Sequence, residues 1–338
     1  MTIPLTHMIA PKVRLRSHDD ALAIVPALLG FQPAESLVLM VVTNAKVQVS
    51  ARVDLFHCQP ARLQSLLAAL KLRYPDAKFF VVIYSANYRL ANQVAQQLES
   101  YIGIEDILDS LISDGKRYWP RLCDDPRCQS PQGLAIPEPN TAVLAEVVGA
   151  GLGILSSREE LANLVSAPNG SEAEIAEDRY EQASHQLLGL EDDEKACLLD
   201  ELLDDLENQI FDSNFDAIKL VTLGVLVAEH WRRNHALIRV NQRNAARQCL
   251  IWQAVVRAMP VSQSVPALTI CALSAWVSGD GALQMICVDR ALEIDPKYSL
   301  TYLLIAIHED LLPPTYWNKL RCEMVSKYSQ IPTATATG

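Results

Sequence analysis

Cys123 and Cys128 come nearest, by residue type and spacing, to the ligands of a metal site. A structural zinc takes four nitrogen or sulfur ligands, usually as two close pairs. The second pair would have to be His57 and Cys58, which are adjacent and would point apart in an extended chain. Because reduced cysteine commonly packs as a small hydrophobe, we favour structural thiols and predict no metal and no cofactor.

Two further motifs touch on enzyme chemistry, and each is incomplete. The glycines at residues 149–153 are spaced like part of a phosphate-binding loop. They follow a predicted helix, however, whereas a dinucleotide loop must follow a strand and open a helix. Ser36 begins a predicted strand without an obvious general base beside it in the sequence. The zinc-deaminase signature and the P-loop are absent from the sequence, so we favour a protein that is not an enzyme.

Two stretches of unusual residues could converge where strand ends meet loops. Tyr118 and Trp119 follow a predicted turn at Asp114 and Gly115, and their rings could line a groove. We favour the alternative that they cap the core beneath the loop that runs to residue 139. The candidate groove for a ligand or partner consists of Gly30, Phe31, Pro33, Ser36, Asp114, Tyr118 and Trp119.

A basic face is the third candidate. Arg239, Arg243 and Arg247 are spaced four residues apart, and they share one face if residues 240–248 are helical. Such a face could contact nucleic-acid phosphates. We favour a solvated face, or pairing with an acidic segment of the same chain, because no aromatic residues interleave with the arginines.

The elements that must position these residues belong to a globular protein. The 338 residues are enough for two domains, and 50% of them are hydrophobic. No apolar run approaches the roughly 20 residues that span a bilayer, and the N-terminus does not resemble a secretory signal. We therefore predict a cytoplasmic protein whose eight cysteines are reduced. The net charge of −11 comes from residues 171–207, which contain 14 acidic and two basic residues.

The first half reads as an α/β (α+β) domain. A helix at residues 19–29 precedes two strands, 36–42 and 47–55, that read as a hairpin. A helix that begins at Pro60, a strand at 78–84 and a second helix follow. Strands at 107–112 and 116–122 form a second hairpin. The order ββαβαββ predicts a mixed sheet of about five strands covered by helices.

The second half reads as all-α. We predict an α/β domain at residues 1–165, an acidic helical insert or linker at 166–210 and a helical bundle at 211–328. A disordered tail is expected at 329–338. The bundle is predicted to contain helices at 218–231, 244–259, 265–277, 283–294 and 299–311, with another after Pro314.

Three stretches resemble a known family. They are VPALLGFQPAESLV at residues 25–38, SDGKRYWPRLCDDPRC at 113–128 with its continuation to 159, and AWVSGDGAL with DRALEIDPKYSL between 275 and 300. Together they are similar to the actinobacterial domain-of-unknown-function family 4192. The resemblance implies a bacterial cytoplasmic protein and assigns no activity.

The last stretch is also similar to part of a tetratricopeptide repeat, with a turn at Gly279 and a second helix that ends before Pro296. Gln284 stands where the repeat normally has a small residue. We predict a helical bundle that contains one such hairpin.

Three functions remain open from the sequence. We favour a non-enzymatic interaction or scaffold protein that binds an unidentified protein partner through its helical half. The second is an enzyme or small-ligand binder with a cleft between residues 30–36 and 114–128. The third is nucleic-acid association through the arginine face, which we rank last. The sequence predicts neither a substrate nor an oligomeric state.

Overall fold

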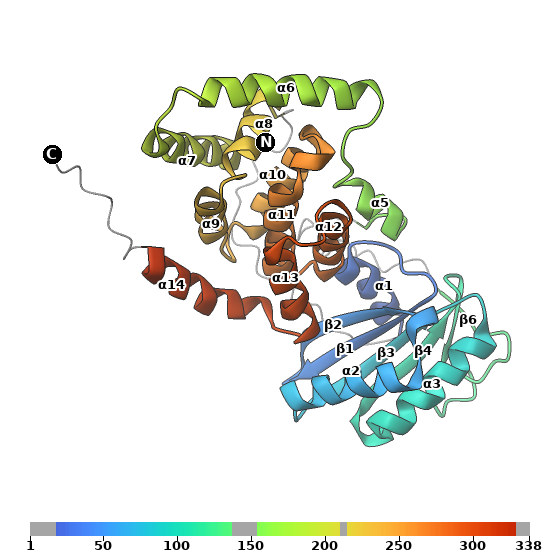
Figure 1. The fold of residues 1–338 in the computed structure, drawn as a ribbon. Helices are drawn as coiled ribbons and strands as arrows, with labels where there is room; N and C mark the ends of the chain where they lie inside the picture. Colours follow the sequence, from blue (N-terminus) through green and yellow to red (C-terminus); the bar gives the residue numbers. More distant parts are fainter. Residues whose placement is uncertain (1–17, 137–153, 210–214, 329–338) are drawn as a thin grey trace, which may run out of the picture. The chain divides into compact units, whose positions relative to one another are not determined.

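The computed structural model of the protein describes residues 18–136, 154–209 and 215–328. The chain forms two compact units, Met1–Glu160 and Leu161–Gly338, and each is described by itself (Figure 1). The helix predicted from Thr141, the glycine motif at residues 149–153 and the tail predicted at 329–338 lie outside the described residues.

The first unit is built on a six-stranded sheet in the order β2-β1-β3-β4-β5-β6. β1 pairs antiparallel with both β2 and β3, whereas β3 pairs parallel with β4. The sheet is therefore mixed, as predicted. The strands are β1 (Ser36–Thr43), β2 (Lys46–Asp54), β3 (Lys78–Tyr84), β4 (Ile107–Ser113), β5 (Arg117–Pro120) and β6 (Leu134–Ala135).

β6 is a sixth strand beside the roughly five that we predicted. We read its segment as a loop because of its prolines and glycine, yet Leu134 pairs with Tyr118 and Ala135 pairs with Arg117. Gly133 precedes this strand with φ 72°, a left-handed conformation that suits glycine. A strand of two residues has no period in its side chains, so no pattern in the sequence predicts it.

Helices cover both faces of the sheet. Consecutive residues of a strand point to opposite faces, and Asp109 and Ser110 of β4 reach different helices. Asp109 pairs with His18 of α1 at 2.8 Å, whereas the Ser110 hydroxyl donates to Glu99 of α3 at 3.0 Å. Figure 1 shows α2 and α3 together on one face. The helices are α1 (His18–Leu29), α2 (Pro60–Arg73) and α3 (Tyr88–Ile102).

The ends of these helices follow the sequence signals. Gly30 comes directly after α1 with φ 76°, a left-handed conformation that commonly ends a helix. Pro60 occupies the first turn of α2. The Asn87 side chain caps α3 by accepting from the Leu90 N–H at 3.1 Å. Each signal therefore fixes where a helix of the first unit begins or ends.

Helices make up the described part of the second unit, after α5 (Arg158–Asn163) has crossed the boundary. None of the described helices is both long and apolar enough to cross a membrane. They are α6 (Ser171–Leu187), α7 (Asp192–Asn208), α8 (Ala217–Leu226), α9 (His230–Arg239), α10 (Ala245–Ala258), α11 (Val265–Ser278), α12 (Gly281–Ile294), α13 (Ser299–Glu309) and α14 (Trp317–Tyr328).

One predicted helix, at residues 218–231, is wrong as a single element. The chain turns after α8 and restarts as α9, with Glu229 as the residue before its first turn. Arg232 stabilises this turn, because its Nε donates to the carbonyl of Leu226 at 2.8 Å. The apolar period continues through the corner, so periodicity alone does not reveal it.

The acidic segment forms α6 and α7, two helices that each have a solvent-exposed face, as expected. Glu191 and Glu194 form a reciprocal capping box at the start of α7. On its other side α7 buries Leu199, Leu203 and Leu206. Within the second unit α6 and α7 lie beside α8 (Figure 1), so the acidic segment is part of a packed helical layer.

The segment that we expected to form a hairpin consists of α11, a tight turn and α12. Gly279 adopts φ 94° at the end of α11, and the Asp280 carboxylate caps α12 by accepting from the Leu283 N–H at 2.9 Å. Gln284 is fully buried and donates to the carbonyl of Leu304 in α13 at 3.2 Å. Where a small residue would let helices approach, this chain therefore places an amide that bonds to the next helix.

The Asp280 cap predicts a pH dependence. Burial raises the pKa of Asp280 to about 6, against hydrogen bonds from Leu283 and Ala282 that lower it. The folded state thus binds this proton more tightly than the unfolded chain, whose pKa is near 3.8. The resulting stabilisation is complete below the unfolded pKa and is lost as the pH rises through the folded pKa.

We therefore expect Asp280→Asn, which keeps a capping acceptor, to have a higher Tm than the natural protein at about pH 7.5 and an equal Tm at about pH 4. Thermal unfolding of both proteins at the two pH values tests this. A Tm difference that does not change with pH contradicts it.

Candidate functional site

The strand register brings four hydroxyl side chains into one row across the end of the sheet. Ser36 pairs with Tyr84, Tyr84 with Ser113, and Ser113 with Tyr118. Directly paired residues project from the same face of a sheet. With strands about 4.8 Å apart, the row spans about 14 Å. We call Ser36, Tyr84, Ser113 and Tyr118 the hydroxyl row.

The hydroxyl row lies on the face that α1 covers. Tyr118 approaches the first turn of α1, with its ring 6.0 Å from that of His18. Burial raises the pKa of Tyr118, and a hydrogen bond with Asp19 raises it further. Asp109 projects from the same face, and burial raises its pKa despite the nearby His18. Polar groups of α1 and β4 therefore border the row on one side.

Tyr84, at the centre of the row, is the least satisfied member. Its side chain is 3% exposed, and its hydroxyl has no hydrogen-bond partner among the described residues. Burial raises the pKa of Tyr84, so the phenol stays protonated at neutral pH. It can therefore both donate and accept a hydrogen bond.

Glu35 binds the loop between β3 and α3, which lies beside the row. Its two carboxylate oxygens accept from the Ser85 hydroxyl and the Ala86 N–H, each at 2.8 Å. Glu35 itself has φ 40°, a strained conformation for a residue with a side chain. Because these partners immediately precede α3, the carboxylate lies where the positive end of the helix dipole favours an anion.

Arg52 borders the row at its other end. Its Nε donates to the Ser36 hydroxyl at 3.0 Å, and its Nη2 pairs with Asp54 at 2.6 Å. The guanidinium lies 5.5 Å from the centre of the Phe31 ring. Phe31 is 1% exposed, and its neighbour Gly30 accepts a backbone hydrogen bond from Leu155. These contacts bury the start of β1.

Trp119 points away from the hydroxyl row. It is paired with Ile112, on the face that carries α3. Its ring lies 5.0 Å from that of Tyr88, and its Nε1 donates to the carbonyl of Pro131 at 3.3 Å. Tyr118 and Trp119 therefore project from opposite faces of the sheet, since neighbours in a strand face opposite ways.

The two predicted stretches meet at one end of the sheet, but their roles differ from residue to residue. Ser36 and Tyr118 lie in the row, while Phe31 and Pro33 are buried beside it. Asp114 instead stabilises the β4–β5 turn, where its carboxylate accepts from the Lys116 and Arg117 N–H groups.

Sequence reasoning missed Tyr84, Glu35 and Ser85. Tyr84 ends an apolar strand and is followed by Ser85, and this change from apolar to polar was the available signal. Glu35 lay inside a motif that we quoted, but its φ of 40° has no signature in the sequence. Tyr84 and Glu35 gain their roles only from the order of the strands in the sheet.

The family model described as a domain of unknown function (DUF4192) matches residues 19–315. This range is most of the 338 residues. The chain belongs to the DUF4192 family. No curated protein and no solved structure matches it. The family match includes the whole hydroxyl row and Glu35, and the family description assigns no activity.

The two cysteines of the DUF4192 chain that came nearest to a metal site, Cys123 and Cys128, lie together. The Sγ atoms of Cys123 and Cys128 are 2.8 Å apart, and both side chains are partly exposed. Among the described residues no three His, Cys, Asp or Glu side chains are grouped so that they could hold a metal ion. Cys58 bonds elsewhere, to the carbonyl of Asp54, and burial raises its pKa to about 11.

We predict that Cys123 and Cys128 oxidise readily to a disulfide. With diamide as the oxidant, the two thiols lose two hydrogens to the diazene and one S–S bond forms. Peptide mass spectrometry should find this cross-link before any that involves the exposed Cys197 or Cys322. Separate alkylation of both thiols after diamide treatment contradicts the prediction.

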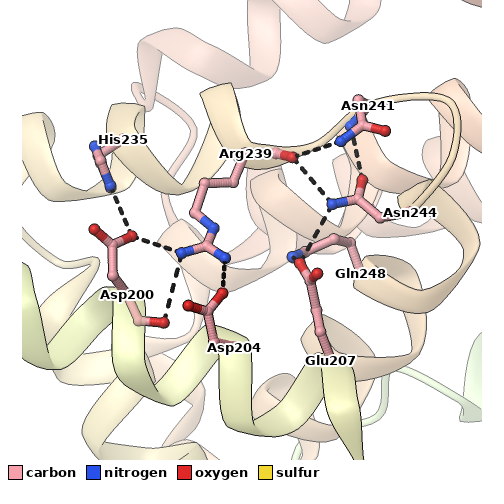
Figure 2. Close-up of polar contacts among 8 residues, drawn as sticks. All are labelled: Asp200, Asp204, Glu207, His235, Arg239, Asn241, Asn244 and Gln248. Carbon is pink, nitrogen blue, oxygen red and sulfur yellow. Dashed lines mark hydrogen bonds and ion pairs between the residues drawn. The ribbon is translucent and has the colours of Figure 1, made fainter.

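Of the three arginines of the candidate basic face, Arg239 pairs with the acidic segment of the DUF4192 chain. Arg239 contacts the carboxylates of Asp200, at 2.7 Å, and Asp204, and His235 lies 2.9 Å from Asp200 (Figure 2). Burial lowers the pKa of Arg239, but the hydrogen bonds that it donates to the two aspartates raise it above its ordinary value.

The other two arginines do not continue one helical face. Residues 240–244 lie between α9 and α10, so the condition for a shared face, a helix over residues 240–248, is not met. Arg247 donates to the carbonyls of Leu206, at 2.7 Å, and Gln209. Arg243 is exposed. Two of the three guanidinium groups are thus used inside the helical unit.

Proposed function

We propose that the α/β unit binds the uncharged polar part of a small molecule at the hydroxyl row. The observation that carries this proposal is the buried Tyr84 hydroxyl, which has no partner among the described residues. Leaving such a group unsatisfied costs about 1–3 kcal/mol. A ligand group that donates or accepts at this point would offset that cost.

The surroundings of the row favour an uncharged group. Burial keeps Tyr84 and Tyr118 protonated, because it raises the pKa of both. A phosphate would favour the start of α3, but the Glu35 carboxylate already bonds to Ala86 there. Like charge would repel a second anion. An amide, a hydroxyl or the edge of a neutral heterocycle suits the row better.

Binding also fits the row better than nucleophilic catalysis. The Ser36 hydroxyl donates to the carbonyl of Ala34 at 2.5 Å and accepts from Arg52. A guanidinium has no acceptor and cannot take the serine proton. The hydroxyl row therefore supports the enzyme hypothesis less than it supports the binding hypothesis.

Tyr84→Phe tests the proposal, with Tyr74→Phe as its matched control. Tyr74 also has a buried hydroxyl without a partner among the described residues, but it directly follows α2 rather than lying in the row. Native mass spectrometry and calorimetry with adenosine, uridine, glucose and nicotinamide would measure binding. We expect a probe with a Kd below about 1 mM that Tyr84→Phe weakens by about 3- to 10-fold and Tyr74→Phe leaves unchanged.

Two results would contradict this function. One is that none of the four probes binds the full chain with a Kd below about 1 mM. The other is that Tyr84→Phe and Tyr74→Phe bind equally well. Neither variant should lose stability, because each removes an unpartnered hydroxyl.

Partner binding by the helical half, an actinobacterial origin and a cytoplasmic location stay proposals. The resemblance to the family supports the last two, and the eight free thiols support a reducing compartment. The hairpin of α11 and α12 supports the first. A pull-down with the full chain that recovers the bait but no reproducible protein would count against partner binding.

A further inference from the structure

Two consecutive arginines of α9 are buried with different partners. Arg232 is 6% exposed and Arg233 is 7% exposed. Arg232 pairs with the Asp192 carboxylate at 3.1 Å and donates to a backbone carbonyl. Arg233 donates from Nη1 to the Tyr298 hydroxyl at 2.6 Å, and from Nε and Nη2 to the Asn234 side-chain oxygen at 3.3 and 3.1 Å. None of the Arg233 partners carries a charge.

A buried guanidinium without a counter-charge is unusual. Charged side chains are seldom buried unless they are paired, and arginine cannot escape the cost by losing its proton. Among the described residues no carboxylate forms an ion pair with Arg233. The helix adds to the cost, because Arg233 lies in the first turn of α9, where the dipole disfavours a cation.

The Arg233 guanidinium has N–H donors left for one more group. A guanidinium has five N–H donors, and the hydrogen bonds to Tyr298 and Asn234 use three of them. The Tyr298 ring packs on the guanidinium at 5.3 Å, and its hydroxyl can still donate its own proton. An acceptor placed between them would receive bonds from both side chains.

The start of α13 also favours an anion. Tyr298 is the residue immediately before α13, whose first turn contains no acidic residue and whose cap receives no side-chain hydrogen bond. The positive end of the α13 dipole therefore lies at the Tyr298 backbone, where it favours an anion. Tyr298 belongs to the third stretch that resembles the family, which the proposed ligand site in the first unit leaves unexplained.

We propose that Arg233 and Tyr298 form an anion-binding site in the helical unit, which takes the carboxylate or phosphate group of a small molecule. An anion would form the missing ion pair with the guanidinium fork, which matches both groups in shape. The site is separate from the hydroxyl row and does not depend on the function proposed for it.

The test compares two adjacent arginines in the full chain. We expect sodium phosphate or sodium acetate at about 10 mM to raise the Tm of the natural protein by about 3 °C over sodium chloride at equal ionic strength. Arg233→Met should abolish this shift, and Arg232→Met, which removes the paired neighbour, should keep it. A shift with only one of the two anions would assign the site to phosphate or to carboxylate.

Arg233→Met should itself fold well, because removing an unpaired buried charge while keeping its volume tends to be neutral or stabilising. If it does not fold, calorimetry with Tyr298→Phe replaces it, and we expect phosphate or acetate to bind at least about 3-fold more weakly. An equal Tm shift in Arg233→Met overturns the proposal. So does a natural protein whose Tm responds to phosphate and acetate no more than to chloride.

Discussion

Replacing Arg121 by methionine is expected to lower the free energy of unfolding of the α/β unit by about 3–5 kcal/mol. Arg121 follows β5 and binds both carboxylate oxygens of Glu99 in α3, at 2.5 and 2.8 Å. The two side chains are only 14% and 15% exposed. The substitution would leave the Glu99 carboxylate buried with the Ser110 hydroxyl as a weaker partner. Urea unfolding measures the loss.

Arg127→Met is the control for this prediction. Arg127 pairs with Asp125 in the same loop, but its side chain is 89% exposed, so we expect no measurable change in stability. The double variant Arg121→Met with Glu99→Gln should lose less than the sum of the single losses, because the buried charge is gone. Equal losses for Arg121→Met and Arg127→Met would contradict the burial argument.

Replacing Gly133 by alanine is expected to lower the same free energy by about 2–4 kcal/mol. Gly133 has φ 72°, which disfavours any Cβ. In addition, a Cβ at this position would lie 2.5 Å from Cε2 of Trp119. The indole would have to leave Tyr88 and the Pro131 carbonyl, and the pairing of β6 would be disturbed with it. Urea unfolding measures this loss as well.

Gly115 separates the two causes. It has φ 88° in the β4–β5 turn, and a Cβ there would meet nothing within 4 Å. Gly115→Ala should therefore lose only the conformational part, about 1–2 kcal/mol. If Gly133→Ala loses no more than Gly115→Ala, the contact with Trp119 does not constrain the loop as we argue.

Local pattern was enough to predict most elements of the first unit. The alternation in β2, the apolar runs of β1 and β3, and Pro60 at the start of α2 each act over a few residues, and each appears in the structure. β6 was missed because two residues have no period. The corner between α8 and α9 was missed because the apolar period runs through it.

The candidate site could be predicted only in part. The meeting of the two stretches followed from the expectation that loops and strand ends share one edge of a sheet. The hydroxyl row needs more, because Ser36, Tyr84 and Ser113 are neighbours only when β1 and β4 flank β3. That order is set by pairings between distant segments, which local residue preferences do not encode. The opposite directions of Tyr118 and Trp119, by contrast, followed from the strand that we had already predicted.

The pairing of α7 with cations that come later in the chain bears on the order in which the protein can fold during synthesis. Asp200 and Asp204 are one helical turn apart and repel each other in an isolated helix. Their cation, Arg239, is added to the chain 35 residues after Asp204. Domains form from the N-terminus as synthesis proceeds, so α7 is made before its cation. A chain that ends before residue 239 would therefore keep the capping box and the buried leucines of α7 but leave its two neighbouring aspartates without Arg239.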